Sequence, residues 1–126
     1  VLLPSMGGLF TWDFIAHSDG EILTGTVGMF GGKLEIRDRL EEPESRVNDL
    51  VMDTRLGRFF KDFSQEYHIS WEALGDGVQQ ATMTDLRYYI RHRYMHHATV
   101  LFNSEGKPVK SIFHPYHDGR NARVPI

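Results

Sequence analysis

Residues 95–113 read MHHATVLFNSEGKPVKSIF, and this stretch decides the fold class. Apolar and polar residues alternate in 95–103 and again in 107–113, as they do in half-buried strands. The segment Asn103 to Gly106 between them has the composition of a hairpin loop, with glycine where a left-handed backbone is needed. The sequence therefore predicts two antiparallel strands joined by a turn.

Working outward, further strand-like runs lie on both sides of one helical stretch. Before it, residues 10–17, 21–30 and 33–39 alternate in the same way, and Ser18–Gly20 supplies a hairpin turn. After it come the runs 67–71 and 78–90. In the stretch 44–64, apolar residues recur every three or four positions, which predicts one helix or two short helices. A break is expected at Asp53-Thr54 or at Gly57.

This order predicts an α+β fold, in which a curved antiparallel sheet of six or seven strands carries one helix or a helix pair on one face. A chain of 126 residues suits one hydrophobic core, so we expect residues 1–126 to form a single soluble domain. Pro4 and the pair Gly7-Gly8 predict an irregular lead-in over 1–9. The proline- and glycine-containing segment 114–126 predicts an irregular tail.

Composition excludes several classes of function. The net charge of −3 gives no overall basic field, so no nucleic-acid partner is expected. The absence of cysteine rules out disulfides, thiolate metal sites and a cysteine nucleophile. No apolar run approaches the roughly 20 residues that cross a bilayer, so the chain is expected to be soluble as it stands. No GxSxG, phosphate-loop or dinucleotide-binding phrase is present, and no catalytic residue is assigned.

Two sets of side chains are candidates for binding. Trp12, Phe14, Arg87 and Tyr88 combine aromatic rings with a cation, and we expect them to line a ligand pocket on a concave sheet. Asp85 and Arg87 have alternate spacing on a predicted strand, which favours a structural ion pair over chemistry.

Histidines gather near the predicted hairpin, and imidazole is the commonest metal ligand in proteins. The candidate metal ligands are His96, His97, His114 and His117. Their spacing matches no established metal motif, so we expect at most weak binding without turnover. Solvated polar positions at strand ends explain the same histidines equally well.

Three phrases together suggest a family. Residues 10–15 (FTWDFI), the glycine-containing stretch 25–32 and residues 85–88 (DLRY) resemble the soluble C-terminal region of membrane-bound metal-dependent hydrolases of the YdjM-like kind. The helical segment ending at 58–64 and the hairpin at 103–106 fall in the expected order, so the resemblance covers about Leu3 to Phe113. The chain departs from the family in the histidine phrases at 91–97 and after His114.

The resemblance implies an extramembrane accessory or binding domain, which is membrane-associated through transmembrane helices upstream of Val1. These helices are its expected partner, with a small ligand or a homo-oligomer as further partners, and the side of the membrane stays open. Any divalent metal belongs to the upstream part of the parent protein, and none is expected in this chain. The alternative is a free-standing small-ligand-binding or enzymatic domain that uses the concave face of the sheet.

Overall fold

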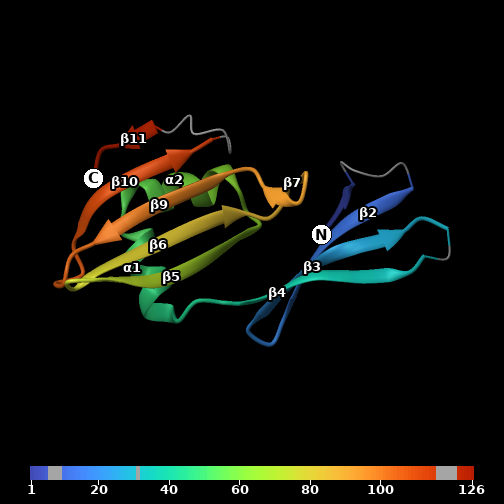
Figure 1. The fold of residues 1–126 in the computed structure, drawn as a ribbon, viewed down its shortest axis with the longest axis horizontal. Coiled ribbons are helices and arrows are strands. Elements are labelled where there is room, and N and C mark those ends of the chain that lie inside the picture. The colour runs from blue at the N-terminus through green and yellow to red at the C-terminus, as the bar shows by residue number, and fades with distance from the viewer. Residues whose placement is uncertain (6–9, 31, 116–121) are drawn as a thin grey trace.

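A computed structural model of the chain describes residues 1–5, 10–30, 32–115 and 122–126. Its strands form a four-stranded sheet, a five-stranded sheet and a two-stranded ribbon, all paired antiparallel (Figure 1). The predicted α+β class and helix pair are confirmed. The strands are divided between two main sheets where the sequence predicted one of six or seven strands. Residues 42–44 and the two helices lie between the fourth and fifth strands, which do not pair with each other.

The N-terminal sheet has the order β1-β2-β3-β4. Its strands are β1 (Leu2–Pro4), β2 (Thr11–Ser18), β3 (Glu21–Gly28) and β4 (Leu34–Glu41). The expectation of an irregular lead-in over 1–9 is wrong for residues 2–4, which pair with β2, while 6–9 lie outside the described residues. The free edge of β2 supplies these hydrogen-bond partners, and a proline is tolerated because β1 is itself an edge strand.

The helical stretch forms α1 (Ser45–Met52) and α2 (Arg55–Phe63), with the predicted break at Asp53-Thr54. Thr54 makes this break, because its Oγ1 atom accepts a hydrogen bond from the Gly57 amide (3.0 Å) and donates one to the Val51 carbonyl (2.6 Å). The end of one helix is thus joined to the start of the next by a single side chain.

The C-terminal sheet has the order β11-β10-β9-β6-β5, and Figure 1 shows both helices behind it. Its strands are β5 (Tyr67–Gly75), β6 (Val78–Asp85), β9 (His97–Phe102), β10 (Pro108–His114) and β11 (Ala122–Val124). The main core lies between this sheet and the helices and is formed by Val47, Val51, Leu56, Phe60, Ile69, Ala81, Met83, Ala98, Val100 and Phe102.

The prediction of an irregular tail over 114–126 is wrong at two places. His114 completes β10, and residues 122–124 form β11, which pairs with residues 111–113. The edge of β10 gives this short strand its partner, a contact that local sequence does not reveal. Residues 116–121 lie outside the described part of the chain.

A short ribbon joins the two sheets. The predicted strand 78–90 ends at Asp85, and the chain then turns into β7 (Tyr89–Ile90) and β8 (Arg93–Tyr94). At the ribbon tip, Arg91 and His92 both have positive φ angles (52° and 65°), as a tight hairpin turn requires.

The ribbon packs against the N-terminal sheet. The Arg37 guanidinium lies 3.8 Å from the centre of the Tyr89 ring, and the Tyr94 hydroxyl donates a 2.6 Å hydrogen bond to Asp38. Burial and this hydrogen bond raise the pKa of Tyr94. A small second core of Ile15, Ile22 and Leu86 completes the junction.

None of the described helices is long and apolar enough to cross a membrane.

Candidate functional site

The side of the five-stranded sheet opposite the helices is the surface we consider as a site. In β6, Ala81 and Met83 are fully buried in the core under the helices, so the alternate residues project to the other side. Cross-strand pairing places their neighbours on the same side. We call this surface the open face; its central residues are Gln80, Thr82, Thr84, His97, Thr99, Leu101, Lys110, Ile112, His114 and Arg123.

Hydroxyl and imidazole groups pair across the strands of the open face. Thr84 Oγ1 lies 3.2 Å from His97 Nδ1, and His97 Nε2 donates a 3.0 Å hydrogen bond to the Tyr94 carbonyl. Thr99 Oγ1 lies 3.2 Å from His114 Nε2. These side chains are half-buried. The face therefore offers oriented polar groups that can bind a ligand through hydrogen bonds.

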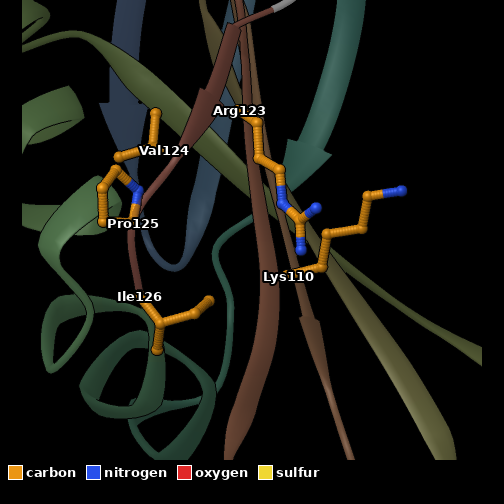
Figure 2. A pocket seen from close by; sticks show the side chains of 5 residues that line it. All are labelled: Lys110, Arg123, Val124, Pro125 and Ile126. Carbon is orange, nitrogen blue, oxygen red and sulfur yellow. The ribbon is translucent and has the colours of Figure 1, made fainter.

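The β10–β11 edge of the open face is basic. Lys110 and Arg123 line a pocket of about 290 Å³ together with Val124, Pro125 and Ile126. Figure 2 shows the two basic side chains ending on the same side of this pocket. Neither cation forms an ion pair with any residue that the structure describes. An anionic group is the natural ligand for such a pair.

A second hollow, of about 510 Å³, lies at the opposite edge of the sheet, between β4, α1 and β5. The Trp71 ring forms part of its wall, and the Arg46 guanidinium lies 5.7 Å from the ring centre. His68 donates a 2.8 Å hydrogen bond to the Glu41 carbonyl and so ties β5 to the end of β4. This hollow combines an aromatic wall with charges of both signs.

The histidines expected to bind metal are engaged in other contacts. His97 and His114 are cross-strand neighbours, and each contacts a threonine. His96 donates through Nδ1 to the Pro115 carbonyl at 2.6 Å, and His117 lies outside the described residues. In the part of the chain that the structure describes, no group of three or more His, Asp or Glu side chains can hold a metal ion. The metal site formed by these four histidines stays a prediction.

The four residues expected to line one pocket belong to different parts of the molecule. Trp12 and Phe14 lie on β2 of the N-terminal sheet. Arg87 and Tyr88 follow β6, where the Tyr88 ring packs edge-on against His96 (ring centres 5.5 Å apart) and Arg87 lies beside Phe63. None of the four lines either of the two hollows described above. The pocket formed by all four stays a prediction without a contact to support it.

Asp85 and Arg87 form a compact ion pair, although Arg87 lies beyond the strand and not on its face as the spacing suggested. Asp85 is fully buried and accepts from the Arg87 backbone amide, Nε and Nη2, each at 3.0 Å, and from Ser64 Oγ at 2.8 Å. Arg87 also donates to the Phe63 carbonyl at 3.0 Å. The bond to Asp85 raises the pKa of Arg87. The pair joins the end of β6 to the end of α2.

This geometry, a helix pair covering one face of an antiparallel sheet, agrees with the comparison with known families. The family model of the YfhP C-terminal alpha/beta plait domain matches residues 47–123. The chain belongs to this family. We call the five-stranded sheet with its two helices the plait. The matched residues include the whole of the open face, while the N-terminal sheet, whose strand β4 lines the second hollow, lies before them. The family description states an architecture and no activity. No curated protein and no solved structure gives a significant match.

Sequence reasoning missed Lys110, Arg123 and the threonines of β6 and β9 as site residues. A signal was present in the strands themselves, because Thr82, Thr84 and Thr99 occupy the polar positions of the period-two pattern. What the pattern could not show is that these positions align across neighbouring strands.

Proposed function

We propose that the plait is the ligand- or partner-binding domain of a membrane-bound hydrolase and that it binds anionic groups on its open face. One observation carries the proposal: the helices cover one side of the five-stranded sheet, while the other side combines threonine hydroxyls, imidazoles and an unpaired basic edge. Lys110 and Arg123, which form this basic edge, have no ion-pair partner among the described residues.

Anion binding follows from the chemistry of this face. Lys110 and Arg123 supply positive charge at one edge, within a chain whose net charge is −3. In a protein with a negative net charge, anions are attracted to a local basic patch and not to the surface as a whole. The threonine hydroxyls can donate hydrogen bonds to an anion or to sugar hydroxyl groups. Val124, Pro125 and Ile126 add an apolar wall beside the charges.

Membrane attachment rests on two supports. The phrases at 10–15, 25–32 and 85–88 resemble the C-terminal region of YdjM-like hydrolases, and the family's own description calls it a C-terminal domain. The sequence encoded immediately upstream of Val1 tests this part. Several apolar segments of about 20 residues are expected there. A start codon directly before Val1 would instead favour the free-standing binding domain.

Binding is tested by amide chemical shifts during titration with inorganic phosphate. Shift changes are expected in β10 and β11 next to Lys110 and Arg123, and the Lys110→Gln/Arg123→Gln variant should weaken binding at least about tenfold. The matched control, Arg55→Gln/Lys61→Gln, removes two exposed cations from α2 on the other side of the sheet and should change nothing. Shifts confined to the helices, or unaltered binding in the first variant, would contradict the proposed surface.

A further inference from the structure

The N-terminal sheet has an apolar side that faces away from the rest of the molecule. In β2, Asp13 and Ile15 are buried toward the ribbon and the plait, so Trp12 and Phe14 point the other way. The alternation predicted for 10–17 is confirmed, but the aromatic positions are not the buried ones. Asp13 is accommodated inside because Arg37 lies 3.7 Å from it.

Further apolar residues lie on this outward side, because they pair across the strands with Trp12, Phe14 or their neighbours. Phe14 lies opposite Gly25, which in turn lies opposite Ile36, and the Phe14 ring occupies the space over Gly25 that a side chain would fill. We call this side the outer face; its apolar members are Leu2, Trp12, Phe14, Leu23, Val27, Leu34 and Ile36. Leu2 is 63% exposed, Leu34 60% and Ile36 42%.

Apolar residues lie on both sides of this sheet, since Ile15 and Ile22 pack inward against Leu86. An antiparallel sheet with one solvated side normally turns its polar residues to water and its apolar residues inward. Here Asp13, Thr24 and Asp38 face inward, and both helices of the described chain lie on the other sheet (Figure 1). A contiguous exposed apolar surface of this kind marks an interaction site.

We propose that the outer face is covered by a second copy of the same chain, in a two-fold dimer with the two N-terminal sheets stacked face to face. The three eight-residue strands β2, β3 and β4, about 4.8 Å apart, give a surface of roughly 14 by 26 Å in projection, and the three-residue β1 widens it at one edge. Protruding side chains enlarge its accessible area toward the roughly 800 Å² that each partner buries in a standard interface. Two such sheets stack about 10 Å apart.

Charge favours a second copy over a lipid surface. The charged residues on the outer face are Glu21, Arg39 and Glu41, and the side chains of Arg39 and Glu21 lie 3.9 Å apart, so the face has no excess of cations for anionic headgroups. At the end of the sheet, Lys33 lies 3.6 Å from Glu35. An apolar surface is complementary to itself, which is what a two-fold interface requires. Phe10 and Phe30, whose ring centres lie 5.7 Å apart, add apolar surface at the same end of the sheet.

Sedimentation velocity of the 126-residue chain between about 5 and 500 µM tests the dimer. A concentration-dependent dimer is expected. Ile36→Glu and Leu34→Glu, each of which places two like charges across the interface, should weaken it at least about tenfold. Both positions are exposed in the monomer, so both variants should fold, as circular dichroism will show. Val109→Glu is the matched control, since Val109 is 48% exposed on β10 of the other sheet and should leave dimerisation unchanged.

Three results would overturn the proposal. The chain would be a monomer at every concentration, or its dimer would be insensitive to both outer-face variants. In the third result, the Trp12 fluorescence of a monomer shifts when vesicles of phosphatidylcholine and phosphatidylglycerol are added but does not change when the protein concentration is raised. This result would assign the face to lipid. A Trp12→Phe variant isolates that signal from Trp71.

Discussion

Two buried serines differ in whether their hydroxyl groups have a hydrogen-bond partner, and we expect them to differ in their effect on stability. Ser64 is fully buried and donates to Asp85 Oδ1 at 2.8 Å, next to the Glu66 carbonyl at 3.1 Å. Ser111 is equally buried in β10, but its Oγ atom has no hydrogen-bond partner among the described residues. An unsatisfied buried hydroxyl loses its water contacts without replacement.

The same substitution should therefore have opposite effects at the two serines. Ser111→Ala is expected to raise the free energy of unfolding by about 1 kcal/mol, and Ser64→Ala to lower it by about 1–3 kcal/mol because Asp85 loses a donor. Urea denaturation followed by circular dichroism measures both values. A loss of stability in Ser111→Ala would mean that the hydroxyl has a partner after all, such as a buried water.

At the scale of elements, Gly57 decides how closely the two helices approach. Although it lies inside α2, a methyl group at this position would collide with the Val51 carbonyl oxygen and come within 2.7 Å of the Val51 carbonyl carbon. Its amide also donates to Thr54, which caps α2. The glycine is thus required by the contact with the end of α1 and not by the helix itself.

Gly57→Ala is expected to destabilise the domain by about 1–3 kcal/mol, because overpacking forces the helix ends apart. Helix propensity alone predicts the reverse, a gain of about 1 kcal/mol. The sign of the change in urea denaturation therefore separates the two effects. Lys61→Ala, an exposed position on the same helix, serves as the control and should change stability little.

At the scale of the whole molecule, His17 connects the N-terminal sheet to the plait. Its Nε2 atom lies 2.9 Å from Glu66, just before β5, and its Nδ1 atom lies 3.3 Å from Glu42, after β4. The hydrogen bonds to Glu66 and then to Glu42 raise the pKa of His17 despite an opposing effect of burial. Arg87 also lies near Glu66, and His68 contacts the Glu41 carbonyl.

This link should be pH-dependent. A raised pKa means that folding favours the protonated imidazole, so the stabilisation is complete below the ordinary value of about 6.5 and is lost as pH rises through the raised pKa. His17→Gln should lower the free energy of unfolding at pH of about 5.5, by no more than about 1 kcal/mol because the pair is exposed, and should have little effect at about 8.5.

The control is His92→Gln at the ribbon tip, which has no carboxylate partner among the described residues. It should show no such pH dependence. A constant difference between wild type and His17→Gln from pH of about 5.5 to 8.5 would mean that the His17 contacts do not depend on its charge.

The sequence by itself determined the local structure. Alternation and turn residues located most of the strands, the steps of three and four residues located the helices, and Thr54 marked the break between them. These features are set by residues close together in the chain, so a single sequence contains the information. The α+β class follows from their order.

Only the tertiary structure decided how the strands are grouped and which side of each is covered. A period of two separates the faces of a strand but does not say which of them meets the core, because that depends on partners far along the chain. For this reason the alternation at Trp12 and Phe14 could not show that these rings lie on the side of the sheet opposite Asp13 and Ile15. The short strands β1 and β11 likewise exist because β2 and β10 offer them an edge. The open face is the same kind of property: Thr84 and His97, or Lys110 and Arg123, become neighbours only when separate strands align.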